Sequence, residues 1–264
     1  MKLRVIDVVF SYASVPVLKS VCLELAQSEM LGIVGPNGTG KSTLIRCINR
    51  ILSPQKGSIL LDEREIKEMR RMELAKKLGY IPQRGQHSFP ATVFDVVLMG
   101  RRPHLSWRSS EKDEEKVLDM LQMLNIEHLA MRDINELSGG QQQKVFIARA
   151  LAQDPEVLLL DEPTSNLDIR HQLEVMDIIK TIVKEKGISA IMAIHDLNLA
   201  ARYMDRIIMM NSGKIFAAGN PVSILTPDNI KCVYGVEAEV NNSNGSPYIV
   251  PIRPVRPNGG GNEV

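Results

Sequence analysis

The most constraining feature of this chain is a glycine-rich segment, residues 35–42, that follows a short apolar run and opens a helical pattern. Its residues are Gly35-Pro36-Asn37-Gly38-Thr39-Gly40-Lys41-Ser42. The glycines let successive backbone N–H groups turn toward one point, and the N-terminus of the following helix adds partial positive charge there. A loop of this composition between a strand and a helix is a phosphate-binding loop. The chain is therefore predicted to be an α/β protein whose strand at residues 31–34 feeds this loop.

The apolar patterning of the rest of the chain agrees with an α/β fold. Residues before the phosphate loop read as β-rich, whereas the second half alternates between strand and helix, which favours a mostly parallel sheet. Strands are expected at residues 3–9, 21–25, 31–34, 58–61, 157–160, 188–194 and 206–210, and helices at 41–50, 111–129, 141–152, 169–186 and 197–202. In the helix at 111–129 we expect one apolar face, made of Val117, Leu118, Leu121, Met123 and Leu124.

Composition and charge argue against several classes of protein. Lys and Arg number 32 and Asp and Glu number 31, so no excess positive charge favours nucleic acid or anionic membrane. No apolar run approaches the roughly 18 residues that a membrane-spanning helix needs, and residues 1–12 lack the apolar stretch of a signal peptide. We therefore expect a soluble chain. Its cysteines, Cys22, Cys47 and Cys232, show no metal-ligand spacing and are expected to be free thiols in a reducing cytoplasm.

Two carboxylates add hydrolytic chemistry to the phosphate loop. Lys41 can reach the β- and γ-phosphates of a nucleotide, the Ser42 hydroxyl is placed to hold Mg²⁺, and Thr43 is expected to bond a phosphate oxygen. Further along the chain, an apolar strand ends in Asp161 and Glu162. Asp161 is expected to hold Mg²⁺ through water, and Glu162 is the candidate general base for the water that attacks the γ-phosphate.

A second anion site is predicted at residues 137–141, Leu137-Ser138-Gly139-Gly140-Gln141. The backbone N–H groups of Ser138, Gly139 and Gly140 open a helix, and no second phosphate-binding lysine lies beside them. Such a donor-rich helix start suits a γ-phosphate presented by another subunit. Residues 137–141, here called the signature, lie after the phosphate loop and before the two carboxylates in the chain. With these motifs in this order, the chain resembles the ATP-binding cassette (ABC) family from about Lys2 to about Tyr234.

The resemblance implies a particular fold. This is a P-loop NTPase core with a mostly parallel sheet, an N-terminal antiparallel β subdomain and an inserted α-helical subdomain at about residues 84–153. Residues 1–240 would form this single nucleotide-binding domain. Residues 241–264 would be a C-terminal extension, rich in Asn, Gly and Pro, whose end we expect to be disordered.

The resemblance also implies roles for single residues. Tyr12 would stack on adenine, and Gln83 would contact Mg²⁺ and relay the nucleotide state to a transmembrane partner. His195 would hydrogen-bond the γ-phosphate and fix the attacking water beside Glu162. Asp168 would lie at a subunit interface near that phosphate, although its position also fits a helix N-cap. Residues expected to contact ATP are Tyr12, Gly35, Pro36, Asn37, Gly38, Thr39, Gly40, Lys41, Ser42, Thr43, Ser138, Gly139, Gly140, Gln141 and Asp168. The other histidines, expected at the surface or in packing, are His87, His104, His128 and His171.

The resemblance implies that the protein is an ATPase that works as a head-to-tail homodimer and traps ATP and Mg²⁺ between its two subunits. We expect it to sit at the cytoplasmic face of the cell membrane, below two permease subunits. Residues 84–93 are the expected docking surface for a permease helix. Residues 93–104, 233–236 and 247–251 further resemble ATPases of iron-siderophore, haem and cobalamin importers, in which an extracytoplasmic binding protein delivers the metal chelate.

Three other interpretations stay open. The ATPase of a split exporter would carry the same motifs. A soluble ABC ATPase of DNA repair or translation usually carries a long coiled coil or two cassettes, which this sequence lacks, and the neutral charge gives no footprint for nucleic acid. A regulatory cassette that binds ATP without turnover is disfavoured because Lys41, Glu162 and His195 are all present.

Overall fold

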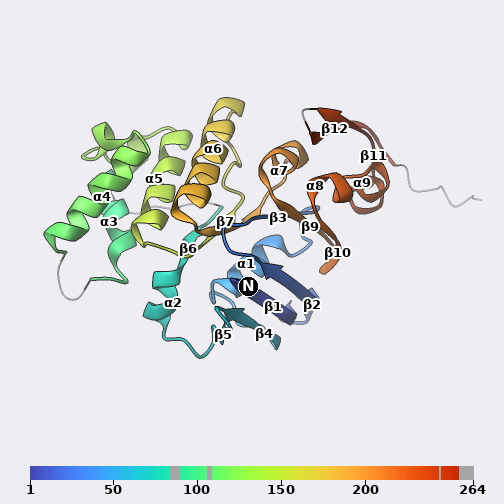
Figure 1. Cartoon of the computed structure of the whole chain (residues 1–264), viewed down its shortest axis with the longest axis horizontal. Helices are drawn as coiled ribbons and strands as arrows, with labels where there is room; N and C mark the ends of the chain where they lie inside the picture. The colour runs from blue at the N-terminus through green and yellow to red at the C-terminus, as the bar shows by residue number, and fades with distance from the viewer. Residues whose placement is uncertain (84–89, 106–108, 244, 256–264) are drawn as a thin grey trace, which may run out of the picture.

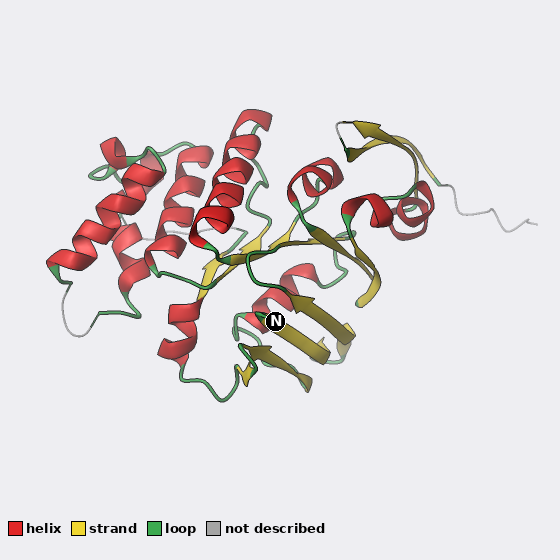
Figure 2. Cartoon of the chain, in the orientation of Figure 1, coloured by secondary structure: helices red, strands yellow, loops and turns green. Residues whose placement is uncertain are grey.

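The computed structural model of the chain describes residues 1–83, 90–105, 109–243 and 245–255 (Figure 1). Within these residues the strands form a four-stranded, a six-stranded and a two-stranded sheet. Helices cover one face of the six-stranded sheet (Figure 2), and the four-stranded sheet lies beyond the other face. The expected α/β fold, with a parallel core and a separate antiparallel β unit, is confirmed.

The antiparallel sheet is built from residues 3–25 and 56–65. Its strands, in the order β2-β1-β4-β5, are β1 (Leu3–Tyr12), β2 (Val15–Leu25), β4 (Lys56–Leu61) and β5 (Arg64–Glu65). β1 and β2 form a hairpin in which Leu3 faces Leu25 and Tyr12 faces Val15. The strand expected at residues 3–9 is too short, because residues 10–12 continue the pairing with β2 up to the hairpin turn.

The six-stranded core sheet is parallel except at one edge. In the order β10-β9-β3-β8-β7-β6, its strands are β10 (Lys214–Gly219), β9 (Arg206–Asn211), β3 (Met30–Val34), β8 (Ser189–Ala193), β7 (Val157–Asp161) and β6 (Leu78–Ile81). Only β10 pairs antiparallel, with β9. The carboxyl ends of β3, β6, β7 and β8 therefore meet along one edge, the usual place for ligand binding in such sheets.

Alternate residues of the core strands face different layers. In β7, Val157 and Leu159 pack with α1 (Lys41–Ile48) and the antiparallel sheet. Leu158 and Leu160 pack with the helices on the opposite face. All four side chains are fully buried, which explains why this strand is a continuous apolar run instead of an alternating pattern.

The remaining helices form three groups along the chain. α3, α4 and α5 pack together at one end of the molecule, α6 and α7 cover the core sheet, and α8 and α9 lie near β10 and the C-terminal hairpin (Figure 1). Their bounds are α2 (Arg71–Lys77), α3 (Val93–Leu98), α4 (Glu111–Met123), α5 (Gly139–Ala152), α6 (Ile169–Lys186), α7 (Leu197–Tyr203), α8 (Pro221–Ile224) and α9 (Pro227–Tyr234), with 3₁₀ turns η1 (Met99–Arg101), η2 (Glu127–Leu129) and η3 (Ile134–Glu136). In the described residues no helix is long and apolar enough to span a membrane.

The single helix expected at residues 111–129 is wrong. α4 ends at Met123, and Asn125 takes a left-handed conformation with a φ of 54°, which asparagine tolerates better than most residues. The expected apolar face is also only partly correct. Val117, Leu121 and Leu124 are buried, whereas Leu118 is 50% exposed and Met123 is 43% exposed.

Most of the described C-terminal extension is a β-hairpin. β11 (Val236–Ser243) pairs antiparallel with β12 (Ser246–Pro254), and β11 runs across residue 240, where we expected a boundary. The Asn198 side chain on α7 holds the hairpin: its amide donates to the Ile249 carbonyl at 3.2 Å and its oxygen accepts from the Ile249 N–H at 2.7 Å. The disorder expected for residues 258–262 lies outside the described residues.

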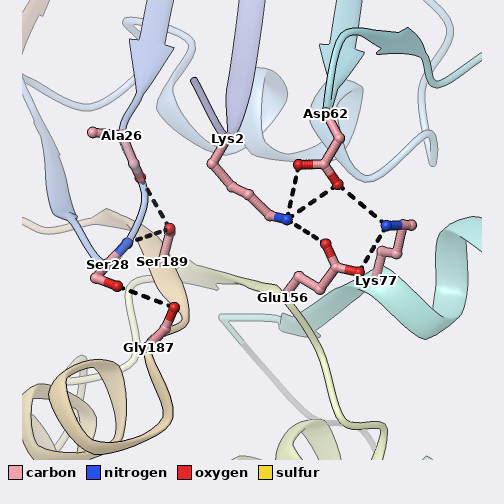
Figure 3. Close-up of polar contacts among 8 residues, drawn as sticks. All are labelled: Lys2, Ala26, Ser28, Asp62, Lys77, Glu156, Gly187 and Ser189. Carbon is pink, nitrogen blue, oxygen red and sulfur yellow. Dashed lines mark hydrogen bonds and ion pairs between the residues drawn. The ribbon is translucent and has the colours of Figure 1, made fainter.

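A ring of four charges ties the antiparallel sheet to the core sheet (Figure 3). The Lys2 ammonium contacts Asp62 at 2.9 Å and also contacts Glu156. The Lys77 ammonium contacts the same two carboxylates, Glu156 at 2.7 Å and Asp62 at 3.2 Å. Because these residues come from the starts of β1 and β7, the β4–β5 turn and the end of α2, the ring fixes the two sheets relative to each other.

Candidate nucleotide-binding site

The phosphate loop connects β3 to α1 and requires glycine at two positions. Gly35 has a φ of 148°, and a Cβ there would lie 2.4 Å from the Met210 carbonyl oxygen. Gly40 caps α1 with a φ of 101°, and a Cβ there would lie 2.8 Å from the Leu18 side chain. The loop is therefore held close to β9 and β2, and only glycine allows the backbone turn that opens the helix.

Lys41 is buried at the first position of α1, with only 4% of its surface exposed. Its ammonium donates to the carbonyl oxygens of Gly35 at 2.8 Å and Pro36 at 3.0 Å. Burial lowers the pKa of Lys41, and the nearby Glu162 and Asp161 carboxylates oppose that shift. The positive charge is thus held in a partly desolvated position within the phosphate loop itself.

Ser42 and Asp161 form a pair at the ends of two neighbouring elements. The Ser42 hydroxyl donates to Asp161 Oδ1 at 2.6 Å. Asp161 is fully buried, and its other oxygen, Oδ2, has no hydrogen-bond partner within the described residues. Burial raises the pKa of Asp161, against the hydrogen bond from Ser42. A buried carboxylate oxygen that lacks a donor beside a serine hydroxyl fits a hard divalent cation such as Mg²⁺.

Glu162 is the centre of a three-residue cluster. Its carboxylate accepts from the Gln83 side-chain amide at one oxygen and contacts the His195 imidazole Nε2 at the other. These residues follow β7, β6 and β8, three adjacent parallel strands. Glu162 has a φ of 54°, and its N–H donates to the Ala193 carbonyl at 3.1 Å. A buried carboxylate contacted on both oxygens, on a strained backbone, has a fixed orientation, which a general base requires.

A pocket of about 260 Å³ joins these residues to Tyr12. It is lined by Tyr12, Val17, Asn37, Gly38, Gly40, Lys41, Ser42, Thr43 and Glu162. The Tyr12 ring is 44% exposed and packs edge-on against Phe10, with ring centroids 4.9 Å apart. An aromatic face therefore stands beside the phosphate loop, where an adenine base could stack on it.

The signature residues are not among those that line this pocket. Ser138 caps α5 in a reciprocal capping box: its N–H donates to Gln141 Oε1 at 3.1 Å, and its hydroxyl accepts from the Gln141 N–H at 3.4 Å. Asp168 likewise caps α6. Among the described residues, neither the signature nor Asp168 lines the pocket of Lys41 and Glu162. A phosphate bound at the signature of this subunit would have to come from elsewhere.

One contact in this region was not expected from the sequence. We expected His171 to be a surface or packing residue, but its Nδ1 lies 2.8 Å from the Asp168 carboxylate and its ring covers Gly140. The available signal was the spacing of Asp168 and His171, a helix cap followed three residues later by a side chain that can return the bond. Of the other histidines, His104 bonds the Gln153 carbonyl at 2.9 Å, and His87 lies outside the described residues.

Comparison with known proteins agrees with this geometry. The sequence profile of the ABC transporter family matches residues 18–165, and the chain belongs to that family. An uncharacterized ABC transporter ATP-binding protein of Methanocaldococcus jannaschii is 51% identical over 252 residues, 96% of this chain and 98% of that protein. The ferric enterobactin transport ATP-binding protein FepC of Escherichia coli is 36% identical, covering 95% and 94% of the two chains.

Solved structures share the fold. A transporter described as of the metal-chelate type, in an inward-facing conformation, superposes with a TM-score of 0.83 at 27% identity, over 96% of this chain and 98% of that one. The fold and the family expected from the sequence are therefore confirmed.

Proposed function

We propose that this chain hydrolyses ATP to ADP and phosphate and powers an importer of metal chelates. The observation that carries the ATPase proposal is the Glu162 carboxylate, held by Gln83 and His195 beside the phosphate loop. Lys41 would neutralise the β- and γ-phosphates, and Ser42 and Asp161 would hold Mg²⁺. When bound, the cation would supply charge stabilisation at the phosphate oxygens.

In the proposed reaction, Glu162 accepts a proton from the water that attacks the γ-phosphorus. The water oxygen forms the new bond to phosphorus, and the bond from phosphorus to the β–γ bridging oxygen breaks, with its electrons leaving on ADP. With ATP bound, His195 would donate to the γ-phosphate in place of the contact that its Nε2 makes with Glu162 here, and the Gln83 amide would keep the carboxylate aligned. Positioning and preorganised charge are the main requirements of phosphoryl transfer.

The site needs a second copy of the chain. The signature at α5 offers the backbone N–H groups of a helix start, with Ser138 and Gly139 exposed, away from the pocket of the same subunit. In a head-to-tail homodimer, the signature of one copy would face the γ-phosphate on Lys41 of the other. Closure would then depend on the γ-phosphate, and hydrolysis would release it.

Replacing Ser138 by Arg tests the shared site. The larger, charged arginine side chain would block the approach of the two copies, so ATPase turnover should fall at least about tenfold. The affinity of the single subunit for ATP should stay unchanged. Ser110→Arg is the matched control, because Ser110 caps α4 with the same reciprocal box. Both variants lose a cap, worth about 1 kcal/mol. Full-rate hydrolysis by the Ser138→Arg variant would refute the shared site.

A permease would dock in the groove between α2, β6, η1 and α5. This groove, about 560 Å³ in volume, is lined in part by Arg50, Arg71, Tyr80, Met99 and Arg149. More than half of the Met99 surface is exposed. Three arginines around an apolar strip suit a short amphipathic helix that carries carboxylates. Gln83 lies three residues after Tyr80, which lines the groove, and its side-chain amide contacts Glu162, so it would connect the groove to the base. Residues 84–89 of the expected docking surface lie outside the described residues.

The substrate proposal rests on the relatives. The ferric enterobactin and metal-chelate type proteins suggest a chelated metal as cargo, delivered from an extracytoplasmic binding protein to the permease. The chain would then work at the cytoplasmic face of the membrane. A split exporter would use the same chemistry in the opposite direction.

Isolation from native membranes tests the transport proposal. The Glu162→Gln protein is solubilised with ATP and purified through an affinity tag, and its partners are identified by mass spectrometry. We expect a permease with many membrane-spanning helices, in equimolar amount to this chain. Arg71→Glu, which inverts charge in the groove, should reduce the recovery at least about fivefold. Recovery of an exporter-type permease, or of soluble partners alone, would refute the importer.

A further inference from the structure

His171 is wedged between the signature and the loop that precedes α6. If Gly140 carried a Cβ, that atom would lie 2.4 Å from His171 Cδ2 and 2.8 Å from Cγ. The imidazole therefore lies directly on the backbone of the signature, and Gly140 is buried beneath it whereas Gly139 is exposed. A side chain at position 140 would displace either the ring or the helix start.

The same imidazole holds Asp168. Its Nδ1 lies 2.8 Å from Asp168 Oδ2, and the His171 backbone N–H donates to Asp168 Oδ1 at 2.9 Å. Both oxygens of the carboxylate are thus engaged by one residue. These contacts, the backbone hydrogen bond first, lower the pKa of Asp168, so the carboxylate is ionised at neutral pH and accepts both bonds.

Further hydrogen bonds hold the loop that leads from Asp168 back to Glu162. The Gln172 side-chain amide donates to the Leu167 carbonyl at 3.1 Å and to the Thr164 carbonyl at 3.4 Å. Ser165 then donates to the Glu162 carbonyl, from its N–H at 3.1 Å and its hydroxyl at 2.9 Å. The loop between Glu162 and α6 is therefore fixed at both ends.

We propose that His171 is a positioning residue that locks the signature of a subunit to the Asp168 loop and, through it, to Glu162 of the same subunit. When the signature moves to engage the phosphate held by the second copy, His171 would transmit that movement to Glu162 of its own subunit. The two sites of the dimer would then hydrolyse ATP together. This inference rests on the proposed function, because it needs the signature to bind a phosphate of the second copy.

Two variants separate the hydrogen bond from the packing. His171→Asn keeps a donor at the place of Nδ1 and an atom at the place of Cδ2. His171→Leu has nearly the same shape but no donor. Arg170→Ala is the control on the same turn, because the Arg170 side chain pairs only with Glu174 among the described residues.

We expect His171→Leu to lower kcat about tenfold, within the range reported for residues that couple sites. The Hill coefficient for ATP should fall toward one, while ATP affinity of the single subunit and Tm stay unchanged. His171→Asn should keep kcat within about threefold of the parent, and Arg170→Ala should match the parent. Equal kcat and Hill coefficients in the Leu and Asn variants would overturn the proposal.

The Glu162→Gln background separates this inference from the proposed function. If Glu162→Gln with ATP forms no dimer in sedimentation velocity, the shared site itself is wrong. If it dimerises, and Glu162→Gln/His171→Leu dimerises with the same Kd, the signature does not depend on His171 and the inference fails. We expect the double variant to dimerise at least about fivefold more weakly.

Discussion

Glu162→Gln is expected to lower ATP turnover by about 10²–10⁴-fold, the usual contribution of a general base, while ATP binding is retained. Glutamine has the shape of the carboxylate but no basic oxygen, so it cannot take the proton from the attacking water. It can still accept one of the two bonds that Gln83 and His195 now make to Glu162. The pocket keeps its shape, and only proton transfer is removed.

The same variant should trap the closed dimer. With ATP bound and not hydrolysed, the γ-phosphate continues to hold the signature of the second copy. In sedimentation velocity, the Glu162→Gln protein should therefore be a dimer with ATP and a monomer without nucleotide. Turnover is measured separately, by phosphate release. Turnover at the parent rate would remove Glu162 as the base.

Glu156→Gln is the matched control for this prediction. Glu156 immediately precedes β7, and Glu162 follows that strand directly, but Glu156 belongs to the charged ring with Lys2 and Lys77. The substitution removes a carboxylate from the same strand without touching the pocket. It should leave turnover unchanged and lower Tm slightly, because partly exposed ion pairs contribute up to about 1 kcal/mol.

The convergence of Glu162 and His195 could be predicted from local patterns, whereas Gln83 was expected from the family resemblance alone, because no strand was expected at residues 78–81. Glu162 and His195 each come one or two positions after an apolar strand, and neighbouring parallel strands end along one edge of the sheet. The phosphate loop was predictable for a similar reason, since its glycines and Lys41 are contiguous in the chain. Which chemical role each residue plays remains a prediction from the family resemblance.

Features that depend on contacts between distant elements could not be predicted. His171 covers Gly140, 31 positions earlier in the chain, and no local period reports such a contact. The C-terminal hairpin was hidden by its composition. Asn, Gly and Pro are depleted in strands, so a segment rich in these residues predicts an extension and not the pairing of β11 with β12.

Lys41→Met is expected to weaken ATP binding by about 100-fold. Charge-assisted hydrogen bonds contribute about 1.5–3 kcal/mol each, and the loss of one or two from a buried phosphate site accounts for that factor. Methionine keeps the length and apolar stem of lysine and removes only the charge. A fluorescent ATP analogue, titrated against both proteins, measures the two dissociation constants directly.

Lys41→Met should not destabilise the nucleotide-free protein, although it weakens ATP binding. Burial lowers the pKa of Lys41 in the folded state, so the folded state disfavours the charged form relative to the unfolded state. At pH values below the pKa of Lys41 in the unfolded state, desolvation of the ammonium lowers the free energy of unfolding. Removing the charge removes this cost. The Tm of Lys41→Met without nucleotide should therefore equal or exceed that of the parent.

These two effects distinguish a lost phosphate contact from a misfolded loop. Saturating ATP and Mg²⁺ should raise the Tm of the parent, because a ligand that binds only the folded state stabilises it. The same addition should leave the Tm of Lys41→Met almost unchanged. Lys112→Ala, at an exposed position on α4, should keep the full shift. A normal ATP-induced shift in Lys41→Met would contradict the assignment of the phosphates to this loop, whereas a low nucleotide-free Tm would point to a folding defect.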